Sequence, residues 1–220
     1  MTNHDKLVVF GASHLGQQTL THLRNHFRHL TVVGFVDDTM AAGTPIVDEL
    51  VCLGGLDEVA RSDAHGPSRA AMVFAIGYAD MRGRRQALDR VDAAGFELFS
   101  VIHPQAIIDP TATIEAGSTV LAGAIVDQGV KLEAGSYVDI GVRIGEDACL
   151  GRASYVSSGA ALGGGVRVGE DCFLGMDCTI TTGVTVGRRC FINAKSLVAR
   201  DLKDGTKLVE LHKARELPNA

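Results

Sequence analysis

The sequence predicts an α/β, Rossmann-like domain over residues 1–104, followed by a left-handed parallel β-helix over residues 105–220 with a short C-terminal cap. Two patterns predict this fold class. Strand-like and helix-like segments alternate in the first half, and a six-residue aliphatic repeat runs through the second. Residue usage changes near His103-Pro104, because 16 of the 26 glycines follow residue 104 whereas seven of the eight histidines lie at or before residue 103.

The first half reads as a small parallel sheet covered by helices. A buried strand over residues 6–10 runs into a glycine-bearing turn over residues 11–16, and Leu20, Leu23, Phe27 and Leu30 follow at helical spacing. Further strands are predicted over residues 31–36, 71–76 and 96–102, with a helix over residues 79–94. This alternation is typical of parallel sheets with helices on their faces.

The second half places one aliphatic residue at every sixth position. These positions are Ile108, Ile114, Val120, Val126, Leu132, Val138, Ile144, Leu150, Val156, Leu162, Val168, Leu174, Ile180, Val186, Ile192 and Val198. A small residue, Cys172, Cys178 and Cys190 among them, mostly follows four positions later. Three such hexapeptides make one triangular coil, so we expect about five coils, with large residues stacked inside and glycines at the corners. The repeat stops after Val198, and residues 207–217 are expected to form the cap.

Composition excludes several partners and compartments. The net charge of −5 gives no basic surface for nucleic acid, and no apolar run approaches the roughly 20 residues of a membrane span. The polar N-terminus is not a secretory signal, and five cysteines without CxxC spacing favour a reducing cytoplasm. His22, His26 and His29 share one helical flank, but no carboxylate there completes a metal site, so they are interpreted as solvated and no metal is expected.

The glycine turn is compatible with nucleotide binding. It offers amide groups and a helix N-terminus to a phosphate, and Asp37 follows at the distance of a ribose-binding carboxylate. Ser13 replaces the second glycine of the dinucleotide fingerprint, and only about 100 residues are available, so NAD or NADP binding is not favoured. A purely structural turn is the remaining alternative.

Several motifs together resemble the bacterial hexapeptide-repeat nucleotide-sugar acyltransferases, which include UDP-4-amino-sugar N-acetyltransferases and sialic acid O-acetyltransferases. The matching pieces cover nearly the whole chain and are Gly11-Ala12-Ser13 with Gly16, Asp37-Asp38, Ala75-Ile76-Gly77, Ile102-His103-Pro104, and the stretch over residues 149–175. The resemblance implies a homotrimer with acetyl-CoA between neighbouring β-helices. It also implies a nucleotide-sugar site at Gly11, Ser13, Asp37, Asp38, Gly77 and Tyr78, with Tyr155 and the backbone of Gly164 near the thioester.

The chain departs from this family at the catalytic base. The family's usual histidine falls at Glu146, followed by Asp147, and no histidine lies between His103 and His212. Glu146 is either a replacement base supported by Asp147 or part of an ordinary corner, because residues 143–151 recur as residues 167–175. His14 stands one position before the family's second histidine, and contact with the reacting sugar is a further hypothesis for it.

The missing imidazole favours amine over alcohol substrates. An alcohol needs a base as it attacks a thioester, whereas an unprotonated amine is already nucleophilic. We therefore expect an acyl-CoA-dependent N-acyltransferase, with acetyl as the acyl group, acting on a nucleotide-linked amino sugar. The alternatives are a non-catalytic relative that binds a nucleotide sugar and a sugar O-acetyltransferase.

Overall fold

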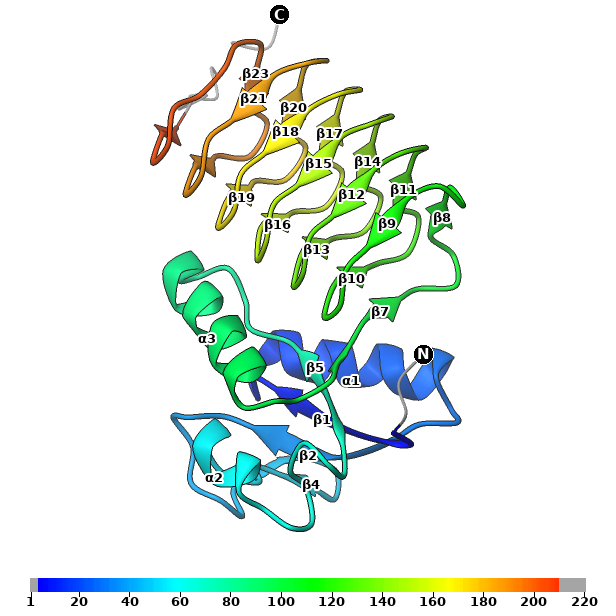
Figure 1. Ribbon diagram of the computed structural model, residues 1–220, viewed down its shortest axis with the longest axis vertical. Helices are drawn as coiled ribbons and strands as arrows, with labels where there is room; N and C mark the ends of the chain where they lie inside the picture. The colour runs from blue at the N-terminus through cyan, green and yellow to red at the C-terminus, as the bar shows by residue number, and fades with distance from the viewer. Residues whose placement is uncertain (1–3, 210–220) are drawn as a thin grey trace, which may run out of the picture.

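The computed structural model describes residues 4–209 and places a small α/β layer structure against one side of a β-helix (Figure 1). The predicted fold class, an α/β region followed by a left-handed parallel β-helix, is confirmed. No helix among the described residues is long and apolar enough to cross a membrane.

The α/β region is built on a four-stranded parallel sheet in the order β2-β1-β5-β6. Its strands are β1 (Lys6–Phe10), β2 (Thr31–Val36), β5 (Ala71–Phe74) and β6 (Leu98–Phe99), and its helices are α1 (His14–His26), α2 (Leu56–Ala60) and α3 (Met81–Ala93). A hairpin of β3 (Pro45–Val47) and β4 (Leu50–Val51) follows β2. Leu20 and Leu23 of α1 pack on one face of the sheet, and the apolar residues of α2 and α3 pack on the other.

Two predicted boundaries shift for physical reasons, and the first helix is shorter than the spacing of its apolar residues suggested. The predicted strand over residues 96–102 divides into β6 and β7 (Val101–Ile102), because Val101 and Ile102 pair with the β-helix rather than with β5. Helix α3 begins at Met81, because the Asp80 carboxylate caps it by accepting from the Gly83 amide at 2.9 Å. Helix α1 ends at His26, so His29 lies beyond the helix and does not share its flank.

The β-helix has three parallel faces. The first face holds β7, β10 (Thr119–Val120), β13 (Tyr137–Val138), β16 (Tyr155–Val156), β19 (Phe173–Leu174), β22 (Phe191–Ile192) and β24 (Lys207–Leu208). The second holds β8 (Ile107–Ile108), β11 (Ile125–Val126), β14 (Arg143–Ile144), β17 (Ala161–Leu162), β20 (Thr179–Ile180) and β23 (Leu197–Val198). The third holds β9 (Thr113–Ile114), β12 (Lys131–Leu132), β15 (Cys149–Leu150), β18 (Arg167–Val168) and β21 (Thr185–Val186).

The aliphatic column predicted from the sequence forms the interior of this prism. From Val120 to Val198 its members are buried in one continuous core, and the small residues four positions later line the same core. Cys172, Cys178 and Cys190 are buried there, and burial raises the pKa of Cys172 and Cys178 to about 12, so these thiols act as compact apolar groups. The corners repeat a left-handed residue every six positions, which explains the abundant glycine.

The end of the β-helix differs from the prediction. Leu202 pairs with Val186 and Leu208 with Ile192, so the chain continues to coil after Val198 with two residues removed from the last coil. The three faces together hold enough strands for six coils rather than five among residues 101–208. Residues 207 and 208 of the predicted cap are therefore strand, and residues 210–217 lie outside the described residues.

Arg84 of α3 joins the two parts of the chain. Its side chain is buried, and the guanidinium donates to the carbonyl oxygens of Gly135 at 2.6 Å and Ala153 at 3.0 Å and also to that of Ile76. The guanidinium also lies 4.8 Å from the centre of the Phe74 ring. Because Gly135 and Ala153 belong to the β-helix, Arg84 holds α3 against it.

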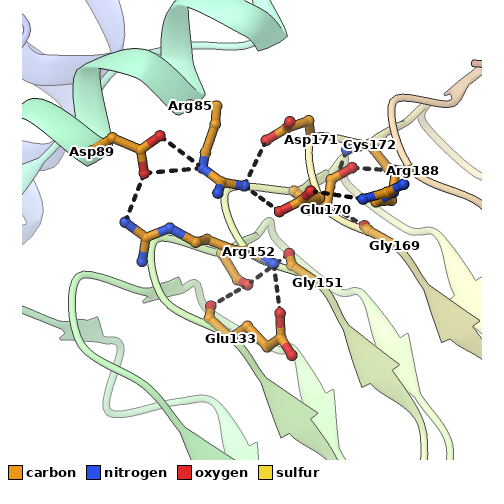
Figure 2. Close-up of polar contacts among 12 residues, drawn as sticks. Arg85, Asp89, Glu133, Gly151, Arg152, Gly169, Glu170, Asp171, Cys172 and Arg188 are labelled. Atoms are coloured by element: carbon orange, nitrogen blue, oxygen red, sulfur yellow. Dashed lines mark hydrogen bonds and ion pairs between the residues drawn. The ribbon is translucent and has the colours of Figure 1, made fainter.

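Ion pairs reinforce this contact at the third corner, between the third and first faces (Figure 2). Arg85 pairs with Glu170 at 2.5 Å and Asp171 at 3.4 Å, and Arg152 pairs with Asp89 at 3.1 Å and with Asp92. These partly exposed pairs each contribute about 1 kcal/mol or less, but together they fix the orientation of α3 on the β-helix.

Candidate active site

The glycine turn lies where β1 ends and α1 begins. Gly11 has a φ of 110°, and a Cβ at this position would lie 2.6 Å from the Ala75 carbonyl oxygen, so only glycine fits. A Cβ at Gly16 would lie 1.8 Å from the Gly11 carbonyl oxygen, so the turn and helix are packed closely. Ser13 is the N-cap of α1, and its side chain makes no capping hydrogen bond. The start of α1 therefore offers amide groups to a ligand.

Asp37, predicted to contact the nucleotide, stabilises this turn. Its Oδ2 accepts from the Ala12 amide at 3.0 Å, and its Oδ1 accepts from the Thr39 amide at 2.9 Å and the Thr39 hydroxyl at 2.6 Å. Burial opposes ionisation, but these hydrogen bonds outweigh it and lower the pKa of Asp37. The carboxylate is ionised at neutral pH and fixes the end of β2 against the turn.

Asp38 points to the other side of the sheet edge. Its carboxylate pairs with Arg90 at 2.5 Å and accepts from the amide of Leu56, the first residue of α2, at 2.9 Å. Burial again opposes ionisation, but the Arg90 and Leu56 hydrogen bonds outweigh it and lower the pKa of Asp38. The structure thus brings Gly11, Ser13 and Asp37 together and places the Asp38 carboxylate in a contact between α2 and α3.

Tyr78 and Tyr155 meet on the outer face of the β-helix. The Tyr78 ring, half exposed, lies 5.0 Å from the Tyr155 ring and 4.7 Å from the Phe173 ring. It follows Gly77, where no atom would contact an added Cβ, so the space beside the end of β5 is open. A predicted substrate residue and a predicted acyl-CoA residue are therefore in contact within one chain.

Tyr155 belongs to an aromatic ladder that the sequence analysis missed. The ladder consists of Tyr137, Tyr155, Phe173 and Phe191, which stack with ring centres 4.3, 6.0 and 5.0 Å apart. The missed signal was their spacing of eighteen residues, which is one coil, at the outward strand position. Burial raises the pKa of Tyr137 and Tyr155, so both hydroxyls stay protonated at neutral pH and neither serves as a base.

A groove of about 610 Å³ opens beside this ladder. It is lined by Tyr78, Asp80, Met81, Arg82, Asp171, Phe173, Arg189 and Phe191. The lining combines aromatic rings with Arg82 and Arg189, and this combination suits a ligand that has a flat ring and phosphate groups.

Glu146 and Gly164 meet at the second corner, between the second and third faces. The Glu146 carboxylate covers the Cα of Gly164 so closely that a Cβ there would lie 2.0 Å from Oε1. Within residues 4–209 the exposed Glu146 side chain has no hydrogen-bond or ion-pair partner, and the Gly164 amide has no acceptor. The predicted base and the predicted oxyanion donor are therefore neighbours, with the Glu146 side chain exposed and Gly164 buried beneath it.

The two Gly-Glu-Asp segments have the same backbone conformation but differ in their contacts. Asp147 and Asp171 have φ values of 55° and 59°, so both segments are corners of the same kind. Glu170 is paired with Arg85, whereas Glu146 is unpaired and Asp147 is exposed. A groove of about 450 Å³ lies beside the second corner, lined by Ile125, Arg143, Gly145, Gly163 and Thr181 among others.

One chain does not bring all the predicted site residues together. The second corner lies opposite the first face of the prism, and the α/β region packs on the first face and the third corner. His14 is exposed at the start of α1, beside the glycine turn. The nucleotide-sugar residues and His14 are therefore on one side of the chain, and Glu146 with Gly164 is on the other.

Known proteins share features of this architecture. A family model described as the hexapeptide repeat of succinyl-transferase matches residues 165–194. No curated protein sequence matches the chain.

Solved structures resemble the chain over nearly its whole length. The acetyltransferase domain of PglB from Neisseria gonorrhoeae is 29% identical, with a TM-score of 0.82 covering 93% of this chain and 96% of that one. The same domain solved with acetyl coenzyme A gives a TM-score of 0.80. A histidine-to-asparagine mutant of perosamine N-acetyltransferase from Caulobacter crescentus, in complex with CoA and GDP-perosamine, is 28% identical and covers 92% of each chain with a TM-score of 0.81. The predicted resemblance to hexapeptide-repeat nucleotide-sugar acyltransferases is confirmed.

Proposed function

We propose that this protein is an acyl-CoA-dependent N-acyltransferase that transfers an acetyl group to the amino group of a nucleotide-linked amino sugar. The observation that carries the proposal is the similarity, over more than nine-tenths of the chain, to an acetyltransferase domain solved with acetyl coenzyme A and to an enzyme solved with CoA and GDP-perosamine. Both the α/β region and the β-helix take part in that match, which supports the proposal for the whole chain.

The acceptor nucleotide is proposed to bind at the glycine turn. The free end of α1 at Ser13 would receive a phosphate, and the open space at Gly77 would admit the rest of the nucleotide. The Asp37 carboxylate already accepts three hydrogen bonds, so its role in this proposal is to hold the turn in its binding geometry. Tyr78 would pack against the base or sugar.

The reaction is proposed to take place between subunits of a homotrimer. The second corner with Glu146 faces away from the α/β region of its own chain, so a neighbouring chain must supply the acceptor. Exposed apolar side chains on the second face and the adjoining corner support such an assembly. These are Ile107, Ile125, Ile140, Met176 and Leu197.

The chemistry proposed at the second corner is direct acyl transfer. The unprotonated amine attacks the thioester carbonyl, a tetrahedral intermediate forms, and its collapse expels CoA as a thiolate while the new amide keeps the acetyl group. The Gly164 amide, which has no acceptor within residues 4–209, would stabilise the oxyanion of the intermediate. The nitrogen's surplus proton would pass to Glu146 or to water, and the CoA thiolate would finally be protonated.

A non-catalytic relative that binds nucleotide sugars is the second candidate. The specific observation in its favour is the absence of any histidine between His103 and His212, because the family's usual base falls at Glu146. O-acetylation is less consistent with this site, since an alcohol depends more strongly on a base with a pKa near neutrality.

Thiol release from acetyl-CoA tests the proposal. Purified protein is supplied with acetyl-CoA and a panel of GDP-, UDP- and dTDP-linked amino sugars, and free CoA is followed with a thiol reagent. We expect release that depends on one acceptor, reduced about 100-fold in Glu146→Ala. Asp63→Ala, which removes an exposed carboxylate in the loop after α2, is the matched control and should keep full activity. Nucleotide binding without CoA release from any acceptor would favour the non-catalytic relative.

A further inference from the structure

Three histidines converge where α1 meets the first strand of the β-helix. His22 and His26 are one turn apart on α1, and His103 follows β7. The His103 ring lies 4.3 Å from the His26 ring and 5.6 Å from the His22 ring, centre to centre. One ligand nitrogen from each residue lies within 4.8 Å of the other two. His22 and His26 were predicted to be solvated because no carboxylate on their helical flank completes a metal site, and the fold brings His103 to them as a third ligand.

We propose that His22, His26 and His103 form a binding site for a divalent transition metal of the Zn²⁺ class. Imidazole nitrogens are preferred ligands of Zn²⁺, and three of them leave a fourth position for water. Zn–N bonds of about 2.0–2.1 Å require ligand nitrogens about 3.3 Å apart in a tetrahedral site, so the set must contract slightly on binding. His26 is exposed, and rotation of its side chain can close that gap.

The charges around the cluster suit a cation. Burial, followed by repulsion from the neighbouring histidines, lowers the pKa of both His22 and His103, so these rings are neutral and able to bind metal at pH 7. The Asp139 carboxylate acts in the opposite direction and raises the pKa of His22, so a negative charge lies near the cluster. Asp139 is held in place by the Ser158 hydroxyl and the Ile140 amide, each at 2.8 Å.

The hydrogen bond of His103 occupies Nδ1 and leaves Nε2 as the nitrogen for a metal once the ring changes tautomer. Its Nδ1 accepts from the Gln105 amide at 3.1 Å, so the proton of the neutral ring sits on Nε2. A metal at Nε2 takes the lone pair there, and the ring's one proton must then sit on Nδ1. The Gln105 amide loses its acceptor in the loaded form, which gives metal binding a local signature separate from catalysis.

The site would join two parts of the fold. His22 and His26 belong to the α/β region, whereas the His103 amide donates to Val120 in the second coil of the β-helix. A metal bound to all three would therefore link α1 to the β-helix on the side away from Arg84 and the third corner. We infer a structural role for this metal, and the inference does not depend on the proposed acyl transfer.

Zinc titration of tag-free protein tests the site. Isothermal titration with ZnCl₂ should give one saturable Zn²⁺ per chain, and saturating Zn²⁺ should raise the thermal unfolding midpoint. His26→Ala should weaken binding by at least about tenfold and abolish the shift, because removing a direct ligand costs no less than removing a supporting residue. His29→Ala is the matched control, since it removes an exposed histidine just beyond the same helix.

Two further readouts make the outcome unambiguous. Co²⁺ substitution should give visible absorption typical of nitrogen coordination in the native protein and in His29→Ala, but not in His26→Ala. Nuclear magnetic resonance should show the Gln105 amide and the His103 ring nitrogens shifting with the same zinc dependence. Equal zinc affinity in His26→Ala and the native protein, or no saturable binding at millimolar zinc, would overturn the proposal. His26 is chosen over the buried His103 because its replacement leaves the core intact.

Discussion

Replacing Arg84 with methionine should loosen the α/β region from the β-helix. Burial lowers the pKa of Arg84 to about 10, so the guanidinium is still charged at pH 7, yet its hydrogen-bond acceptors are carbonyl oxygens. A hydrogen bond to a charged group contributes about 1.5–3 kcal/mol, so three such bonds contribute roughly 4.5–9 kcal/mol. Removing the charge also relieves several kcal/mol of desolvation cost. We expect a net loss of about 3 kcal/mol, because the buried carbonyl groups of Gly135 and Ala153 and the partly buried one of Ile76 remain unpaired.

Urea unfolding followed by circular dichroism measures this loss at one fixed protein concentration. Arg82→Met is the matched control, because Arg82 is an exposed arginine two residues earlier on the same helix. Arg84→Met should unfold at lower urea than Arg82→Met, and amide hydrogen exchange should increase first along α3. A loss below about 1 kcal/mol relative to the control would show that the Gly135, Ala153 and Ile76 contacts do not hold the two parts together.

Three other predictions concern the candidate site and the packing of the core. Asp37→Ala should cost about 1 kcal/mol at pH 7 by leaving the Ala12 amide unpaired. Because the pKa of Asp37 is lowered in the folded state, its contribution is present above the unfolded pKa, so the difference from the native protein should shrink as the pH falls through the folded pKa; urea unfolding at pH 7 and pH 3 checks this sign. Tyr78→Ala should raise the KM for the nucleotide sugar about tenfold with little change in kcat, and equal KM values would exclude Tyr78 from the acceptor site. Among the five cysteines only Cys149 is not buried, so a thiol reagent should label at most one cysteine of the folded chain, and labelling of two or more would contradict the packing.

The repeated half of the fold was readily predicted because its pattern is local. From Val120 to Val198 every aliphatic residue at a sixth position is buried in the same continuous core, and each corner repeats a residue with left-handed backbone conformation. The prediction failed in the last coil. Leu202 comes two residues earlier after Val198 than the six-residue period predicts, and a fixed period does not detect a shortened turn. The single strand predicted over residues 96–102 was wrong for a related reason. This one apolar run contributes strands to two different sheets.

Contacts between side chains that lie far apart along the chain could not be predicted from the sequence. The structure places the glycine turn beside Asp37, because the carboxyl ends of neighbouring parallel strands share one edge. The Asp38–Arg90 pair and the approach of His103 to α1 depend on how whole elements pack, and no periodicity indicates them. The aromatic ladder was visible as an eighteen-residue spacing, but it was overlooked because only the inward positions were compared.

The most direct test of the proposed activity compares two acceptors that differ in one functional group. Each is the same nucleotide-linked sugar, one with an amino group and one with a hydroxyl at the reacting carbon, incubated with acetyl-CoA and analysed by mass spectrometry. The proposal predicts that the amino sugar becomes N-acetylated with one CoA released per product, while the hydroxyl analogue remains largely unchanged. Equal acetylation of both acceptors would contradict N-acyl selectivity, and no acetylation of any amino sugar that binds would contradict the proposed acyl transfer itself.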